Sequence, residues 1–180
     1  MKIGFIGLGN VGSKLAGSLL RNGYEVIVRD LNDDFVADFA VRGAHTADSP
    51  KQLAQASDII ITCLPSPDAC SAVMEGTEAE EGVIAGLSAG KIWLEMSTTD
   101  ESEIRRIGEL VKAAGAEPVD CPVSGGCHRA DTGNISIFAG CSRAAFERVL
   151  PVLTTLGRRV LHTGELGTAS KLKVVTNYLA

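Results

Sequence analysis

Short apolar segments alternate with longer amphipathic segments along almost the whole chain. The apolar segments predict strands at Lys2–Ile6, Glu25–Val28, Asp58–Cys63, Lys91–Glu95, Glu117–Asp120, Ile135–Ala139 and Arg159–Leu161. The amphipathic segments predict helices at Val11–Arg21, Asp33–Val41, Pro50–Ala56, Pro67–Met74, Ser102–Ala114 and Arg143–Leu156. Strands that alternate with helices of this length indicate βαβ units with right-handed crossovers. The pattern therefore predicts an α/β fold with a doubly wound, mainly parallel sheet.

Polar residues mark the beginnings of two of these helices. Ser66 precedes Pro67, and a hydroxyl acceptor followed by proline is typical of a helix N-terminus. The segment Thr98-Thr99-Asp100-Glu101 has the form of a capping box. Both helices should therefore begin a few residues after a strand ends.

The last part of the chain, residues 164–180, predicts the beginning of a further helix. Leu172, Val175 and Leu179 recur at three- and four-residue spacing, and no capping residue follows them. We therefore divide the chain into a domain of residues 1–163 and a helix that starts in residues 164–180. A second domain, absent from this chain, would follow that helix.

Composition and charge narrow the class of protein. The 180 residues carry a net charge of −5 and no basic run, which argues against a nucleic-acid surface. No apolar segment is long enough to span a bilayer, and the N-terminus leads directly into a strand without a signal peptide. The five cysteines form no C-x-x-C pair, and the three histidines have no neighbours at metal-ligand spacing. We expect a cytoplasmic protein with no metal, nucleic-acid or membrane partner.

The glycine-rich segment Gly7-Leu8-Gly9-Asn10-Val11-Gly12 follows the first strand and opens the first helix. In such a turn Gly7 permits the sharp bend, Gly9 lets a diphosphate approach the backbone, and Gly12 lets helix and strand pack closely. The free N–H groups and the positive end of the helix dipole would hold the diphosphate. This segment predicts a dinucleotide cofactor.

Asp30, at the end of the second strand, bears on the choice of cofactor. A carboxylate at this position accepts hydrogen bonds from the ribose hydroxyls and repels a 2′-phosphate, so we expect NAD. Its neighbour Arg29 could hold such a phosphate, which leaves NADP open. Alternatively, Asp30 is a surface acid that caps the next helix, a role for which Asn32 and Asp33 are rival candidates.

Two further loops should lie at the same edge of the sheet. Leu64-Pro65 and Ser97-Thr98 each follow a predicted strand, and ligands of open parallel sheets bind at the carboxyl ends of the strands. We expect Leu64, Pro65 and Thr98 to contact the nicotinamide half of the cofactor. Alternatively, Pro65 only ends its strand and Thr98 only caps its helix.

Taken together, five segments resemble the β-hydroxyacid dehydrogenase family, which includes 3-hydroxyisobutyrate dehydrogenase, tartronate semialdehyde reductase and glyoxylate/succinic semialdehyde reductases. They are Ile6–Gly12, Leu64-Pro65, Met96-Ser97-Thr98, Asp120–Gly126, and Gly164 to Gly167 with Lys173 and Asn177. The resemblance implies a Rossmann-like domain, then a long helix leading into an all-helical domain that mediates dimerisation. A homo-oligomer is therefore expected when that domain is present.

The resemblance also implies the chemistry. Ser124, Gly125 and Gly126 would bind the carboxylate of a small substrate, since small residues and backbone N–H groups form an anion site. Lys173 would exchange a proton with the substrate hydroxyl. Asn177, on the same helix face, would orient the reacting groups.

The implied function is an NAD(P)-dependent transfer of hydride between the nicotinamide and a small 3-hydroxy acid or its semialdehyde. Two alternatives remain: a non-catalytic NAD(H)-binding module, and an imine reductase-like enzyme. In the first, Ser124-Gly125-Gly126 is a turn and Lys173 a solvated charge. Lys171, two positions from Lys173, should point off the catalytic face and contact solvent or carboxylates.

Overall fold

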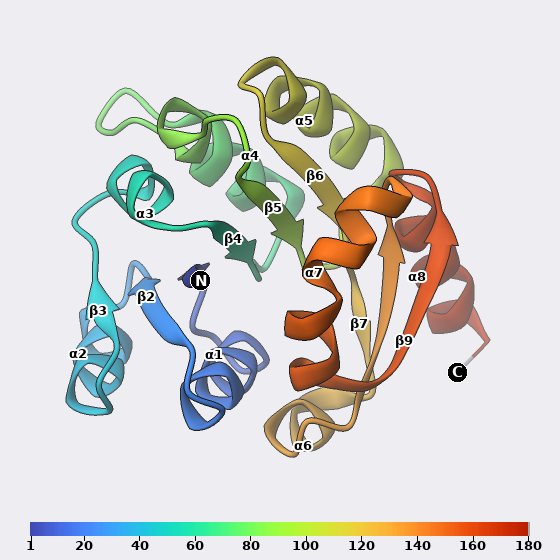
Figure 1. Cartoon of the computed structure of the whole chain (residues 1–180), viewed down its shortest axis with the longest axis horizontal. Coiled ribbons are helices and arrows are strands. Elements are labelled where there is room, and N and C mark those ends of the chain that lie inside the picture. The colour runs from blue at the N-terminus through green and yellow to red at the C-terminus, as the bar shows by residue number, and fades with distance from the viewer. Residues whose placement is uncertain (180) are drawn as a thin grey trace.

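The structure is a computed structural model that describes residues 1–179, and its core is one mixed sheet (Figure 1). The strands are β1 (Lys2–Ile6), β2 (Glu25–Arg29), β3 (His45–Thr46), β4 (Ile59–Thr62), β5 (Ile92–Glu95), β6 (Glu117–Asp120), β7 (Val123–Ser124), β8 (Ile135–Gly140) and β9 (Gly157–Gly164). They lie in the order β3-β2-β1-β4-β5-β6-β8-β7, and β9 pairs with β8. All pairs from β3 through β6 are parallel, which confirms the predicted mainly parallel sheet.

Helices cover both faces of this sheet. They are α1 (Gly12–Arg21), α2 (Asp33–Val41), α3 (Pro50–Ala56), α4 (Pro67–Glu75), the 3₁₀ helix η1 (Val83–Gly86), α5 (Glu101–Ala113), α6 (Gly126–Asp131), α7 (Arg143–Leu156) and α8 (Thr168–Tyr178). Residues of α1, α2, α6 and α7 form one buried cluster with the sheet, and residues of α3, α4, η1 and α5 form the other. Among residues 1–179, no helix has both the length and the apolar character of a membrane span.

The central strands β4 and β5 are apolar at every position before their last residues, Thr62 and Glu95, because both of their faces are buried. Ile59 and Ile61 belong to the cluster on the α1 side, and Ile60, between them, belongs to the cluster on the α4 side. On β5, Trp93 is fully buried on the same side as Ile60. Parallel strands covered on both faces give continuous apolar runs of this kind.

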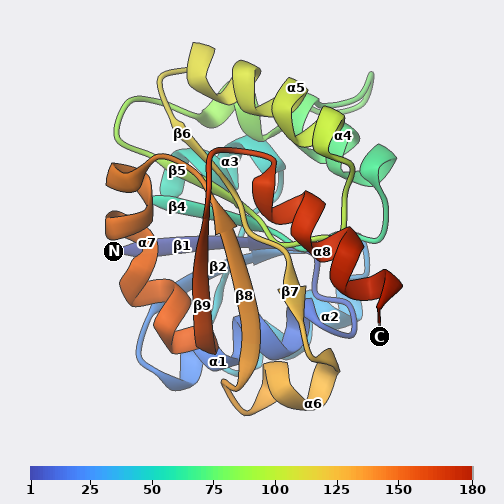
Figure 2. The same cartoon turned by 90° about the vertical axis from the view of Figure 1, so that its right-hand side faces the viewer.

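The far part of the sheet differs from the regular pattern. β8 runs antiparallel to β6 and to β7, and parallel to β9. The sequence pattern missed the two-residue strands β3 and β7, the four-residue 3₁₀ helix η1 and the six-residue helix α6, because each is too short for an element of its type to show a period. Figure 2 shows this part of the molecule, with α8 returning from β9 along the sheet beside β8.

One of the two predicted caps is confirmed and the other is wrong. Ser66 Oγ accepts a hydrogen bond from the N–H of Ala69 at 3.1 Å. The capping box at residues 98–101 does not form: α5 begins at Glu101, after Asp100, which makes no side-chain cap. The carboxylate of Glu101 instead pairs with Arg105 and Lys171, so it is not available to close the box.

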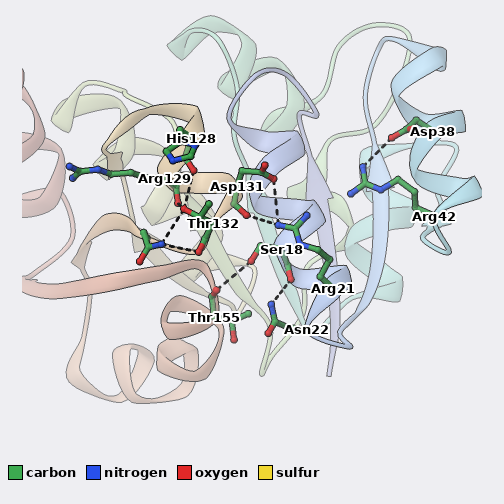
Figure 3. Close-up of polar contacts among 11 residues, drawn as sticks. Ser18, Arg21, Asn22, Asp38, Arg42, His128, Arg129, Asp131, Thr132 and Thr155 are labelled. Carbon is green, nitrogen blue, oxygen red and sulfur yellow. Dashed lines mark hydrogen bonds and ion pairs between the residues drawn. The ribbon is translucent and has the colours of Figure 1, made fainter.

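Polar contacts fix α1 to the helices beside it (Figure 3). The guanidinium of Arg21 donates to the carbonyl of Asp131 in α6 at 2.7 Å and lies 3.5 Å from its carboxylate. Ser18 donates to the carbonyl of Thr155 in α7 at 3.4 Å. The helix that follows the glycine-rich turn is therefore tied to the helix that follows Ser124-Gly125.

The predicted segment 164–180 contains a helix, as expected, and this helix covers residues 168–178. Residue 180 lies outside the described residues. The side chain of Leu166, just before α8, packs against α5 at Gly108. This contact and the pairing of β9 with β8 bring α8 to the sheet edge where the glycine-rich turn lies.

Candidate active site

A cleft of about 790 Å³ opens beside the C-terminal ends of β1, β2, β4 and β5. Twelve of the predicted site residues line it: Gly7, Gly9, Asn10, Val11, Gly12, Asp30, Leu64, Pro65, Thr98, Gly125, Gly126 and Lys173. Three do not: Leu8, Ser124 and Asn177. The fold thus gathers residues from both ends of the sequence around one concave surface.

The glycine-rich turn has the geometry of a diphosphate cradle. Gly7 has a φ of +98°, and a Cβ there would meet the carbonyl of Cys63. A Cβ on Gly12 would meet the carbonyl of Gly7, whereas a Cβ on Gly9 would meet no atom within 4 Å. Among residues 1–179, no acceptor takes the N–H groups of Asn10 and Val11. The turn therefore presents open backbone at the start of α1, which fits the phosphates of a dinucleotide.

Asp30 connects the end of β2 to this turn. Its Oδ2 accepts the N–H of Leu8 at 2.6 Å, and its Oδ1 accepts the N–H of Asn32 at 2.9 Å. The Leu8 side chain is 1% exposed and belongs to the core, so this residue contributes its backbone and not its side chain. Each oxygen of Asp30 keeps acceptor capacity, and the residue lines the cleft where a ribose would lie.

The two predicted nicotinamide-side loops are joined to each other. Ser97 Oγ accepts the N–H of Leu64 at 2.7 Å, and the N–H of Ser97 donates to Glu95 Oε1 at 2.7 Å. Leu64, Pro65 and Thr98 line the cleft beside this contact. The loop after β4 and the loop after β5 therefore form one unit held by Glu95.

Glu95 is fully buried, and its carboxyl group is surrounded by donors. Its Oε2 accepts the hydroxyl of Thr62 at 2.6 Å and the thiol of Cys70 at 3.0 Å. Burial raises the pKa of Glu95 above its ordinary value, while these hydrogen bonds and those of Ser97 act in the opposite direction. Glu95 was not among the predicted site residues, although an acid at the end of an apolar strand is the signal that could have revealed it.

The predicted substrate segment lies at the opposite end of the cleft. Gly125 (φ +133°) and Gly126 line the cleft without side chains, and α6 begins at Gly126. Ser124, in β7, is half-buried and pairs with Ser136 of β8. The structure therefore places the two glycines on the cleft surface, whereas Ser124 does not line it.

Lys173 lines the same end of the cleft, on α8, and is only 9% exposed. Among residues 1–179, no carboxylate forms an ion pair with its ammonium group. Burial lowers the pKa of Lys173 below its ordinary value of 10.5. A lowered pKa leaves a larger fraction of the amine neutral at a given pH, and so makes it a better candidate for both accepting and donating a proton.

The neighbouring residues of α8 differ from Lys173. Lys171 is 62% exposed in its side chain and pairs with Glu101 at 2.8 Å, as expected for a lysine off the cleft face. Asn177 is exposed and does not reach the cleft surface. Of the two lysines, only Lys173 faces the region where a substrate would react.

Asp120, in the predicted substrate segment, holds α8 in place and does not line the cleft. Its two oxygens accept the N–H of Ser170 at 2.8 Å and the hydroxyl of Ser170 at 2.7 Å. The backbone N–H groups of Gly167 and Ala169 also act to lower the pKa of this carboxylate. Burial raises the pKa of Asp120 in spite of these donors. Asp120 thus anchors the N-terminus of the helix that carries Lys173.

A parallel sheet, an open glycine-rich turn and a carboxylate after β2 define the class: an α/β domain built to hold a dinucleotide. Residues 2–164 match the family described as the NAD binding domain of 6-phosphogluconate dehydrogenase, and the chain belongs to that family.

Known proteins agree with this class. The chain is 37% identical over 179 residues to 2-(hydroxymethyl)glutarate dehydrogenase of Eubacterium barkeri, covering 99% of the chain and 58% of that protein. The structure of 3-hydroxyisobutyrate dehydrogenase from Salmonella typhimurium matches with a TM-score of 0.92 at 28% identity, over 99% of this chain and 62% of that one. These matches confirm the resemblance to β-hydroxyacid dehydrogenases.

Imine reductases also have this fold. The imine reductase from Myxococcus stipitatus, in complex with NADP+, matches with a TM-score of 0.90 at 24% identity, over 99% of this chain and 61% of that one. Identity this low shows a shared fold alone. The chain spans about three fifths of the length of the relatives it matches.

Proposed function

We propose that this chain is the cofactor-binding and proton-transferring part of an NAD(P)-dependent oxidoreductase that acts on a small 3-hydroxy acid or its semialdehyde. The observation that carries this proposal is Lys173, a buried cation on the cleft surface with no carboxylate partner among the described residues. Relatives named as dehydrogenases of 2-(hydroxymethyl)glutarate and of 3-hydroxyisobutyrate support the class of substrate.

The proposed chemistry divides between the cofactor and the chain. A bound nicotinamide accepts or supplies the hydride. During oxidation, the hydroxyl proton of the substrate passes to the neutral amine of Lys173, and in the reverse direction the ammonium returns a proton to the carbonyl oxygen. Because burial lowers the pKa of Lys173, a larger fraction of the amine is neutral at a given pH.

The substrate carboxylate would lie against Ser124, Gly125 and Gly126. The two glycines support this placement because they line the cleft beside Lys173 and leave their backbone groups open to a ligand. Ser124 would add its hydroxyl from β7, and Asn177 would orient the substrate or the amine from one turn after Lys173. Neither side chain lines the cleft, so both roles require a movement toward it.

We further propose that α8 leads from the domain of residues 1–163 into a helical domain that closes the cleft and mediates homo-oligomer formation. Exposed apolar side chains on α8 support this: Val174 (55%), Val175 (53%) and Tyr178 (90%). A helix that presents such a surface needs a partner to bury it.

Replacement of Lys173 by alanine tests the proposed function. Turnover of small 3-hydroxy acids should fall by about 10²–10⁴-fold, the usual contribution of a general acid–base group, while NADH binding persists. Lys171→Ala is the matched control, because it removes an exposed lysine of the same helix and should leave turnover unchanged. Full activity in Lys173→Ala would reject the assignment. NADH binding without turnover of any hydroxy acid would favour a non-catalytic module, and turnover of cyclic imines would favour an imine reductase.

A further inference from the structure

The loop between α4 and η1 places a carboxylate beside the end of β2. The guanidinium of Arg29 lies 2.7 Å from Glu80 Oε2, and the two side chains are 19% and 33% exposed. Both residues line the cleft, next to Asp30. They are 51 residues apart in the sequence, and the fold alone brings them together.

The turn that carries Glu80 is well defined. The N–H of Thr77 donates to the carbonyl of Glu80 at 2.9 Å, and Gly76 forms a β-bridge with Glu81. The N–H of Ala79 donates to the hydroxyl of Thr77 at 3.2 Å. These bonds hold the backbone of the turn, so Glu80 faces Arg29 from a fixed position.

The charges at this end of the cleft bear on whether a ribose with a 2′-hydroxyl or one with a 2′-phosphate fits. Among the described residues that line the cleft, the charged side chains are Arg29, Asp30, Glu80 and Lys173. Lys173 lies on α8, at the end near the predicted substrate segment. At the end of β2 there are thus two carboxylates and one guanidinium, and that guanidinium already has an ionic partner.

A 2′-phosphate carries close to two negative charges and needs a cation free to bind it. Here it would approach Asp30 and Glu80 and would have to displace Glu80 from Arg29. A 2′-hydroxyl meets no such obstacle, because it can donate to a carboxylate.

We propose that the Arg29–Glu80 ion pair selects NAD(H) over NADP(H), with Glu80 as the specificity-determining residue. This inference rests on the proposed function. It also gives Arg29 a role. The guanidinium holds Glu80 in place, and because it is paired with Glu80 it is not free to bind a 2′-phosphate.

The test is the binding of NADH and NADPH to three variants, measured by calorimetric titration at constant ionic strength. Wild-type protein should bind NADH more tightly. Glu80→Gln removes one repelling charge and frees Arg29, so the ratio of NADPH to NADH affinity should rise by about tenfold, as for one new charge-assisted phosphate contact. The double variant Arg29→Gln/Glu80→Gln should lose most of that gain.

Glu81→Gln is the matched control. Glu81 is adjacent in the same turn, pairs with Lys51 at 2.6 Å and does not line the cleft. Its substitution should leave the affinity ratio unchanged. The gain in Glu80→Gln should also shrink at high salt, because it depends on an exposed charge contact.

The outcomes separate this inference from the proposed function. An unchanged affinity ratio in Glu80→Gln with intact NADH binding would overturn the selector role alone, as would equal affinity of the wild-type protein for both dinucleotides. Failure of the folded wild-type protein to bind either dinucleotide would overturn both proposals.

Discussion

Asp120 and Ser170 are joined by two hydrogen bonds, although they lie 50 residues apart in the sequence. The carboxylate at the end of β6 meets the first turn of α8, where free N–H groups and the helix dipole favour negative charge. Lys173 follows Ser170 by about one turn of the same helix. The contact therefore determines where the lysine stands relative to the cleft.

Replacement of Asp120 by asparagine should weaken this anchor. The amide keeps one acceptor oxygen but turns a donor toward other donors, so the free energy of unfolding should fall by about 1–3 kcal/mol. Urea denaturation measures the change. Asp48→Asn, at an exposed acid, is the control and should stay within about 0.5 kcal/mol of wild type. Equal stability of the two variants would show that Asp120 does not anchor α8.

Alanine at two positions of the glycine-rich turn should give opposite results. Gly12→Ala places a methyl group against the carbonyl of Gly7, so the domain should lose about 1–3 kcal/mol of stability. Gly9→Ala meets no protein atom, so stability should be unchanged while the methyl group enters the cleft. NADH affinity of Gly9→Ala should fall by about tenfold or more. Thermal unfolding and NADH titration of both variants provide the comparison, and normal NADH affinity in Gly9→Ala would argue against diphosphate binding at this turn.

The raised pKa of Glu95 makes part of the stability depend on pH. Below its ordinary value of 4.5, the carboxyl group is protonated in both the folded and the unfolded chain. As pH rises toward the higher folded-state pKa, the unfolded chain loses this proton more readily, so ionisation favours unfolding.

Glu95→Gln removes this titration. The free energy of unfolding of the wild type minus that of the variant should be greatest below pH 4.5 and fall as pH rises through the folded-state pKa. The subtraction cancels the titration of the other acids. Denaturation at a series of pH values measures the difference, and a flat or rising curve would contradict the assigned direction.

Lys173 should titrate below 10.5, because the folded protein disfavours its charged form. NMR of isotopically methylated lysines reports this titration directly, and Lys173→Arg identifies the resonance by its absence. A resonance that titrates at or above 10.5 would show that burial does not lower the pKa of Lys173. There would then be no reason to expect an increased fraction of neutral Lys173.

The sequence pattern was sufficient for the repeating part of the fold. Continuous apolar runs such as Ile59-Ile60-Ile61 identified strands buried on both faces, and Ser66-Pro67 identified a helix start, because burial and capping act on neighbouring residues. The reversal of β8 relative to β6 could not be read in this way. It depends on which strand edge remains free after β6, a property of the assembled sheet.

The same distinction applies to the candidate site. The glycine-rich turn, Asp30 and the loops at Leu64 and Thr98 carry local signals, and the structure brings them together around the cleft. Glu80 acts through a partner 51 residues away and Asp120 through one 50 residues away, and Glu95 binds Cys70 and Thr62, 25 and 33 residues away, so the roles of these three acids depend on contacts that the fold creates. The roles of Ser124 and Asn177 remain predictions.

The close approach of Gly12 to the Gly7 carbonyl has a consequence for how this protein can diverge. At Gly12, the turn that would bind the phosphates admits no additional carbon atom, so a substitution there should destabilise the domain. Glu80 lies on a surface turn whose backbone contacts do not involve its side chain. A single substitution at Glu80 should therefore shift the preference between NAD(H) and NADP(H) without altering the turn that would hold the diphosphate.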